Sequence, residues 1–266
     1  MKKLLKITLL ALAISPIMTL AQQQFSTPEQ AAGALAEAIN HHDESALDTL
    51  LGDNWSQFLP PDGIDPDAVE RFQRDWKIGH RIVQQENNAW LEVGQEGWRL
   101  PIPIIKDNND WRFDMAAAED EILTRAIGRN ELSAIQAMHA YVDAQQDFYQ
   151  LNHAWAQKII SSDGKKDGLY WPVAPGEAPS PLGPAFSPAE PGEGYHGYRF
   201  RIIKDGESQG VALLAWPVEW GKTGIMSFMI NQNDEVYQAN LGDETQSKAQ
   251  VISQFSPDSN WQAINQ

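Results

Sequence analysis

Hydrophobic residues in the first third of the chain recur at the spacing of an α-helix. Ala31, Leu35 and Ile39 follow one another at intervals of four residues, which places them on one face of a helix. Thr27 and Pro28 precede this run and are typical of the N-cap and the first position of a helix. Two further segments with helical spacing follow before residue 80, so the pattern predicts three N-terminal helices.

Between residues 81 and 114 the pattern changes to short apolar segments separated by turn-forming residues. The separators are rich in Asn, Asp and Gly, so consecutive segments are expected to pair as an antiparallel meander. The third segment contains Pro101 and Pro103, which cannot donate hydrogen bonds to a neighbouring strand, and is therefore expected at an edge or a bulge. The predicted strands are residues 81–85, 89–93, 98–106 and 111–114.

The second half of the chain repeats the order of helix and then strands. Helical spacing runs from Glu119 to about Ile160, and Gly128 is predicted to mark a kink or a break between two helices. Residues 172–194 contain seven of the 16 prolines and are predicted to form a loop. The strands predicted after this loop are residues 198–204, 211–216 and 225–230, with 235–238 as a candidate fourth, and a last helix is predicted near residues 244–252.

This order of elements predicts an α+β protein with two domains. The first, residues 22–115, combines N-terminal helices with an antiparallel meander. The second, residues 116–266, is expected to be a long kinked helix packed on a second antiparallel sheet, with the Pro-rich loop 172–194 between the two elements.

Residues 1–21 have the composition of an export signal. Lys2, Lys3 and Lys6 form a positive end, an apolar run follows, and cleavage is predicted after Ala21. The run is shorter than the roughly 20 residues that span a bilayer, and no second long apolar stretch follows it. The chain has no cysteine to carry a lipid at the cut site. We therefore expect a periplasmic protein exported by a Gram-negative-type signal peptide, without a transmembrane segment after cleavage, and not a lipoprotein.

Composition narrows the classes of function. The chain has 36 acidic and 20 basic side chains, and removal of residues 1–21 would leave 36 and 17, a net charge of −19. The excess of acid is spread over both predicted domains, with −10 for residues 22–115 and −9 for residues 116–266. Nucleic acid is therefore not expected as a partner, because its phosphates bind to Lys and Arg. The absence of cysteine excludes a thiolate zinc site and a cysteine nucleophile.

Segments that match catalytic motifs lack the structural context that those motifs need. Residues 206–210 fit the G-x-S-x-G pattern of serine hydrolases, but a predicted strand lies on each side, so a hairpin turn is expected. Gly221-Lys222-Thr223 lacks the earlier glycine of a phosphate-binding loop. The six histidines form no metal-ligand motif. We predict no catalytic residue, no metal site and no cofactor.

Two clusters remain as candidate binding residues. The first consists of Arg129, Asn130 and Glu131, which place a planar cation, an amide and a carboxylate at the predicted helix break. Such a cluster could grip a carboxylate or a peptide. It could equally hold two helices together, because ion-pair networks are a common reason for such clusters.

The second cluster consists of the aromatic residues at the two ends of the Pro-rich loop, namely Tyr170, Trp171, Tyr195 and Tyr198. Aromatic side chains beside a loop could line a groove for a ligand. They could also clamp the loop onto the predicted sheet. The sequence leaves both roles open.

Several segments resemble a family of uncharacterised exported bacterial proteins, known as domain of unknown function 2950. The matching segments span nearly the whole chain after residue 21, and the pair DGLYWP with SPLGP is specific. One departure is the short turn at residues 206–210, where the family usually has a longer insertion. The resemblance implies no established activity. The segments are residues 25–32, 101–114 (PIPIIKDNNDWRFD), 127–131 (IGRNE), 144–145, 167–172 (DGLYWP), 180–184 (SPLGP), 195–200 and 240–242.

Two weaker resemblances concern the fold. Residues 27–53, followed by a meander that ends in residues 111–114, are similar to the helical start and sheet of nuclear-transport-factor-2-like domains. The second half is similar to the soluble head of type IV pilins and pseudopilins, through residues 144–149, 215–217 and 224–228. The methylation signal and hydrophobic stalk of a true pilin are absent. Such likeness of fold does not imply function.

We expect an exported, non-catalytic binding or envelope-assembly protein that recognises an envelope protein or a peptide. One alternative is a hydrolase that uses carboxylates such as Glu131 and Asp147 at a site between the two domains. Another is a small-molecule carrier with a cavity in the first domain, which Trp90, Trp98 and Trp111 would fill if they pointed inward. The sequence leaves the oligomeric state open.

Overall fold

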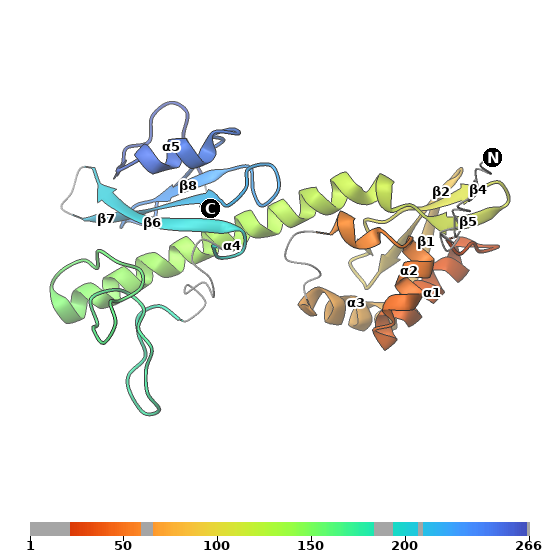
Figure 1. The fold of residues 1–266 in the computed structure, drawn as a ribbon, viewed down its shortest axis with the longest axis horizontal. Coiled ribbons are helices and arrows are strands. Elements are labelled where there is room, and N and C mark those ends of the chain that lie inside the picture. Colours follow the sequence, from red (N-terminus) through yellow and green to blue (C-terminus); the bar gives the residue numbers. More distant parts are fainter. Residues whose placement is uncertain (1–21, 60–65, 184–193, 207–209, 265–266) are drawn as a thin grey trace, which may run out of the picture. The chain divides into compact units, whose positions relative to one another are not determined.

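The computed structural model describes residues 22–59, 66–183, 194–206 and 210–264. These residues fall into two compact units, and each is described by itself below (Figure 1). The first unit ends at Ala118, and the second contains the described residues from Glu119 onward. Both units combine helices with a sheet, so the α+β class is confirmed.

Helices open the first unit. The N-cap predicted at Thr27 is confirmed, because its hydroxyl accepts a hydrogen bond from the backbone N–H of Gln30 at 3.3 Å. Asp43 caps the next helix in the same way, by accepting from the N–H of Ala46 at 3.0 Å. The helical elements are α1 (Pro28–His41), α2 (Glu44–Leu51), a 3-10 turn (Trp55–Phe58) and α3 (Pro66–Ile78).

An antiparallel sheet follows, as the meander pattern predicted. Its strand order is β1-β2-β4-β5, and β3 also pairs with β2. The third predicted strand is divided into β3 and β4 around Pro101 and Pro103, because proline lacks the N–H that a ladder needs. Ala89, Leu91 and Val93 alternate along β2 and are buried. The strands are β1 (His80–Gln85), β2 (Asn88–Val93), β3 (Trp98–Arg99), β4 (Ile104–Asp107) and β5 (Asp110–Phe113).

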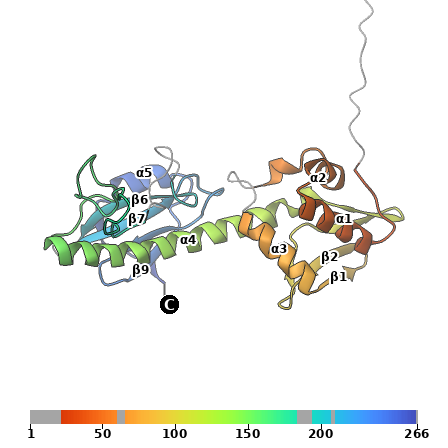
Figure 2. The same ribbon diagram turned by 90° about the horizontal axis from the view of Figure 1, so that it is seen from below.

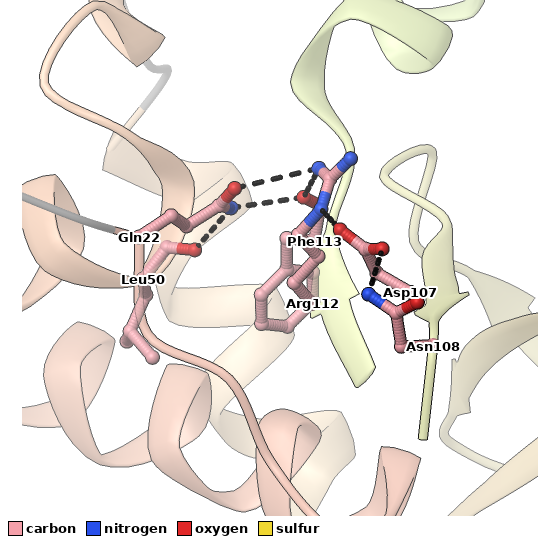
Figure 3. A network of polar contacts seen from close by, with 6 residues as sticks. All are labelled: Gln22, Leu50, Asp107, Asn108, Arg112 and Phe113. Atoms are coloured by element: carbon pink, nitrogen blue, oxygen red, sulfur yellow. Dashed lines mark hydrogen bonds and ion pairs between the residues drawn. The ribbon is translucent and has the colours of Figure 1, made fainter. Parts of the chain in front are cut away.

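A polar network fastens the first described residue, Gln22, to this unit (Figure 3). Its side-chain amide donates to the backbone carbonyl oxygens of Leu50 at 2.8 Å and Phe113 at 2.9 Å. Its amide oxygen accepts from Nη1 of Arg112 at 3.4 Å, and the Nε of Arg112 donates to Asp107 at 3.3 Å. The segment before α1 is therefore bonded both to the end of α2 and to β5.

The helix α4 (Met115–Asn152) is one continuous element of 38 residues. The break predicted at Gly128 is wrong, since the helix continues through it. A glycine inside a helix costs only about 1 kcal/mol relative to alanine, and the packing of a long helix outweighs that cost. Ala126, Ala134 and Met138 are among the buried residues that provide this packing.

The second unit contains a curled sheet of six strands in the order β10-β6-β7-β8-β9-β11. The prediction of a purely antiparallel sheet is wrong, because β10 pairs with β6 in parallel, through Gln254 with Lys204 and Phe255 with Asp205. The elements are β6 (Tyr198–Asp205), β7 (Val211–Pro217), β8 (Ser227–Ile230), β9 (Val236–Ala239), α5 (Thr245–Val251), β10 (Gln254–Phe255) and β11 (Gln262–Ala263).

Two predicted loops lie partly outside the described residues. Of the Pro-rich loop 172–194, residues 172–183 and 194 are described, and they form neither helix nor strand. Residues 207–209 of the G-x-S-x-G segment are also outside the described residues. The segment 206–210 joins β6 to β7, which are adjacent antiparallel strands, so the expected hairpin connection is confirmed.

Helices cover both faces of the second sheet (Figures 1 and 2). On one face, Met138 and Tyr141 of α4 pack with Tyr198, Leu213 and Phe228 of the strands. Side chains alternate along a strand, so its neighbouring residues face the other side. There the residues that pack together are Ile203, Ala212, Leu214, Trp216 and Met229 of the strands and Ala249 of α5.

Tyr198 is buried on the face of the sheet that α4 covers. Its side chain is fully buried at 0% exposure, and its hydroxyl donates to the carbonyl oxygen of Met226 at 2.8 Å. Gly224 lies against this ring, because a Cβ atom there would stand 2.1 Å from the hydroxyl oxygen and 2.6 Å from Cζ. The glycine is therefore required by close packing.

We predict that Gly224→Ala destabilises the second unit by about 1–3 kcal/mol, because the added methyl group must displace the buried Tyr198 ring. The matched control is Gly128→Ala, whose Cβ would meet nothing within 4 Å. It should stabilise α4 by about 1 kcal/mol. Urea unfolding followed by tryptophan fluorescence measures both changes. Equal stability of the two variants would contradict the packing described for Gly224.

Candidate functional site

The predicted cluster on α4 joins the helix to the segment between β7 and β8. The Glu131 carboxylate oxygen Oε1 accepts hydrogen bonds from the backbone N–H groups of Ile225 at 2.9 Å and Met226 at 3.0 Å. The Asn130 side-chain amide donates to the carbonyl oxygen of Thr223 at 3.0 Å. Two roles were left open for this cluster, and these contacts favour the structural one. The cluster holds α4 to the segment between β7 and β8, and not to a second helix as expected.

Arg129, the third member, lies apart from these contacts. Its side chain is exposed on α4, and no hydrogen bond or ion pair is recorded for it within the described part of the chain. The structure therefore brings Asn130 and Glu131 to one place and leaves Arg129 at the surface of the helix.

Tyr198 belongs to the same contact region as Asn130 and Glu131. Burial raises the pKa of the Tyr198 hydroxyl far above its ordinary value, and the Glu131 carboxylate raises it further. The hydroxyl therefore stays protonated and serves as a hydrogen-bond donor. Gly197, at φ +72, completes the contact, because a Cβ there would stand 2.8 Å from Thr223 and 3.0 Å from the Asn130 amide nitrogen.

Trp171 and Tyr170 anchor the start of the Pro-rich loop. The Trp171 side chain is 9% exposed and packs in the core against α4. No acceptor is recorded for its Nε1 among the described residues, and the Lys166 ammonium lies 5.4 Å from the centre of its ring. The backbone of Tyr170 pairs with Ile160 in a parallel bridge. For these two aromatics the clamping role is the one the contacts favour.

The residues just before Trp171 hold a tight turn. Asp167 accepts hydrogen bonds from Lys158 Nζ at 2.8 Å, from the Ser162 N–H at 2.7 Å and from the Ser162 hydroxyl at 3.1 Å. A Cβ on Gly168 would stand 2.8 Å from the Ser161 nitrogen and 2.9 Å from the Lys158 carbonyl oxygen. Asp167 and Gly168, in the first half of the DGLYWP segment, therefore fix the chain just before the Pro-rich loop to residues 158–162.

Tyr195 and Tyr198, the aromatics after the loop, line a cavity of about 470 Å³ in the second unit. Residues of the segment 157–160 and of β6 both line this cavity. We call it the β6 groove. Its lining residues are Gln157, Ile159, Ile160, Gly194, Tyr195, Tyr198, Arg199, Phe200, Arg201, Ile202 and Trp216.

The polar part of the β6 groove is cationic. Nη2 of Arg201 donates to the carbonyl oxygens of Ala249 at 2.5 Å and Ile252 at 2.7 Å, where α5 ends. Its guanidinium carbon lies 5.9 Å from the centre of the Trp216 ring. Among the described residues that line the groove, none carries a carboxylate, an imidazole, an aliphatic hydroxyl or an amine.

Sequence reasoning selected Tyr195 and Tyr198 but missed the arginines and Trp216. A signal was present in the run YRFRI at residues 198–202, where apolar and cationic side chains alternate. Alternation in a strand places the two kinds of side chain on opposite faces. The proximity of residues 157–160 to this strand, by contrast, had no signal in the sequence.

The carboxylates proposed for a hydrolase do not meet. Glu131 and Asp147 are 16 residues apart on α4, which separates them by roughly 24 Å along the axis and by roughly 160° around it. Within the described residues, no group of three or more His, Asp or Glu side chains is arranged to hold a metal ion. None of the described helices combines the length and apolar character needed to cross a membrane.

The first unit contains a smaller cavity of about 270 Å³, lined by residues that include Ala34 and Ala38 of α1 and Leu50 of α2. Residues of α1 and α2 contribute to its lining. Trp90, Trp98 and Trp111, the tryptophans that would fill a cavity in the first domain if they pointed inward, are not among its lining residues. Trp111 is buried in the core of this unit, whereas Trp98 is exposed.

Fold and groove together define an α+β protein of two units, the second of which has a groove lined by aromatic, aliphatic and arginine side chains. The chain belongs to the family described as "Protein of unknown function (DUF2950)", whose model matches residues 22–264. The resemblance drawn from the DGLYWP and SPLGP segments is thereby confirmed. A search of curated proteins found no match, and a search of solved structures found none either.

We predict that Glu131→Ala destabilises the second unit by about 2 kcal/mol, because two backbone N–H groups lose a charged acceptor. Glu131→Gln should recover part of this loss, since its amide oxygen can still accept. Asp147→Ala, at an exposed position on the same helix, should change stability by less than about 0.5 kcal/mol. Chemical unfolding of the three variants measures these differences. Similar losses for Glu131→Ala and Asp147→Ala would contradict the structural role of Glu131.

We predict that Asp167 makes stability depend on pH in the acid range. The hydrogen bond from the Lys158 ammonium, followed by that from the Ser162 N–H, lowers the pKa of Asp167 well below its usual range. A lowered pKa in the folded state gives stabilisation that is fully present above the unfolded pKa of about 4 and is lost as the pH falls from there through the lower folded pKa. The difference in melting temperature between the wild type and Asp167→Asn should therefore be largest at pH 7 and shrink as the pH falls from 4 to 2. Asp163→Asn, an exposed neighbour, is the control, and a difference for Asp167→Asn that is as large at pH 2 as at pH 7 would contradict this prediction.

Proposed function

We propose that the chain is an exported periplasmic protein without catalytic activity that recognises a peptide, or an extended segment of an envelope protein, in the β6 groove. The observation that carries this proposal is the composition of the groove, whose lining combines aromatic and aliphatic side chains with two arginines. The export signal at residues 1–21 supports the periplasm as the compartment.

The size and surface of the β6 groove suit a small part of a polypeptide. A volume of about 470 Å³ lies within the range of roughly 300–1,000 Å³ that is common for ligand sites. Tyr195 and Phe200 offer rigid apolar surface, which is typical of the residues that carry most of the binding energy at interfaces. The described residues of the lining include no pair of nucleophile and base such as hydrolysis of a bound peptide would need. Binding is therefore favoured over catalysis.

The backbone of β6 supports an extended ligand in particular. The Lys204 N–H donates to Ser253 beyond the edge of the strand, and the Tyr198 N–H donates to Tyr195 on the same side. Every second residue of a strand directs its N–H and C=O to the same side, so Ile202 also directs them away from β7. Ile202 lines the groove, and a peptide strand placed there could pair with these groups.

The resemblance of two segments to known folds, drawn from the sequence, is in keeping with a role in the envelope. We propose that the long helix and the curled sheet correspond to the soluble head of pilins and pseudopilins, and the first unit to a nuclear-transport-factor-2-like domain. This correspondence would suit an assembly factor, but fold does not by itself decide function. The groove carries the proposal.

We predict that the groove binds the extended peptide Ac-TVFVT-NH2, and that Tyr195→Ala weakens this binding at least tenfold. The matched control is Tyr149→Ala, which removes an exposed aromatic residue of α4 outside the groove. Fluorescence polarisation of the labelled peptide measures the dissociation constants, and circular dichroism shows that both variants are folded. Equal affinity of the two variants would contradict the proposal, as would a complete lack of binding to the wild type.

A further inference from the structure

We propose that the natural ligand of the β6 groove carries a carboxylate beside an apolar group, and that Arg201 binds this carboxylate. The inference rests on the proposed function and names the chemical class of its ligand.

Acidic side chains dominate this part of the sequence, but not the groove. Residues 116–266 contain 19 acidic and 10 basic side chains. The charged residues among the described lining of the groove are Arg199, whose Nη1 donates to the side-chain oxygen of Gln246, and Arg201. Two positive charges in an apolar cavity attract an anion more strongly than the same charges in open water, because the low local dielectric weakens them less. A cationic ligand is correspondingly disfavoured.

The Arg201 side chain is held in place before any ligand arrives. Its Nη2 group is fixed by the carbonyl oxygens of Ala249 and Ile252, and its planar head lies over the Trp216 ring. These contacts limit the rotation of a side chain that would otherwise lose much conformational entropy on binding. A guanidinium fixed in this way is positioned to donate hydrogen bonds to the oxygen atoms of a ligand.

Donors remain on Arg201 after these contacts. A guanidinium has five N–H groups, and the bonds recorded within the described residues use Nη2 alone. The Nε–H and the two N–H groups of Nη1 are thus available to a ligand. Hydrogen bonds from a guanidinium to a carboxylate are charge-assisted and roughly twice as strong as neutral ones.

A carboxylate on a peptide has two sources, an acidic side chain or the chain's C-terminus. Three probes distinguish them: Ac-TVFVE-NH2 with a side-chain carboxylate, Ac-TVFVT-OH with a terminal carboxylate, and Ac-TVFVT-NH2 with neither. We expect one of the two acidic probes to bind the wild type at least tenfold more tightly than the neutral probe at pH 7. The advantage should fall severalfold in 0.5 M NaCl, because salt screens charges that are partly exposed to solvent.

Variants test whether Arg201 causes the tighter binding of the acidic probe. Arg201→Gln should abolish it, and Arg201→Lys should keep much of it, because the positive charge remains. Lys222→Gln is the matched control, since it removes one positive charge of the same unit outside the groove. Isothermal titration measures the nine combinations of these variants and probes.

Three results would overturn the inference. If the neutral probe binds the wild type as tightly as both acidic probes, the ligand class is wrong, while peptide binding itself stands. If Arg201→Gln and Lys222→Gln reduce the advantage equally, the attraction comes from overall charge and not from Arg201. If none of the probes binds, the proposed function fails together with this inference. The comparison of probes on the wild type needs no variant, so a folding defect in Arg201→Gln does not obscure it.

Discussion

The second unit depends on one constraint, the attachment of α4 to the sheet at Glu131. A single carboxylate oxygen receives the N–H groups of Ile225 and Met226, while the carbonyl oxygen of Met226 receives the Tyr198 hydroxyl. Gly224 leaves room for that ring. The position of β6 follows from this arrangement, because Tyr198 is the first residue of the strand. The groove beside β6 is therefore set by contacts that lie in the core.

Two groups of residues can be distinguished around the groove: those that hold the framework in place and those that line the groove. Glu131, Asn130, Tyr170 and Trp171 hold the framework, as their buried contacts show. The surface available to a ligand comes from side chains at the edge of β6 and from the segment 157–160. Residues of the DGLYWP and IGRNE segments, which carry the resemblance to the family, thus hold the framework. The groove itself is lined mainly by residues outside these two segments.

Local features of the fold were predictable, and long-range pairings were not. The cap at Thr27, the meander and the strands β6 to β9 of the second sheet follow from nearest-neighbour patterns and short turns, whereas β10 and β11 were not predicted. The helix break predicted at Gly128 is absent, because the free energy that a glycine costs a helix is small beside the packing of α4. The parallel pairing of β10 with β6 joins segments about 50 residues apart, and no periodicity records it. Arg201 was missed for the same reason, since its partners Ala249 and Ile252 are distant in sequence.

The central claim is that an extended peptide adds to the edge of β6, and hydrogen exchange at the Ile202 backbone N–H tests it most directly. This N–H points away from β7, and its exchange should slow severalfold when Ac-TVFVT-NH2 is added, because the ligand's carbonyl oxygen would accept it. The Ile203 N–H, which faces β7, should change little. Unchanged exchange at Ile202 at a peptide concentration that saturates binding would contradict the account.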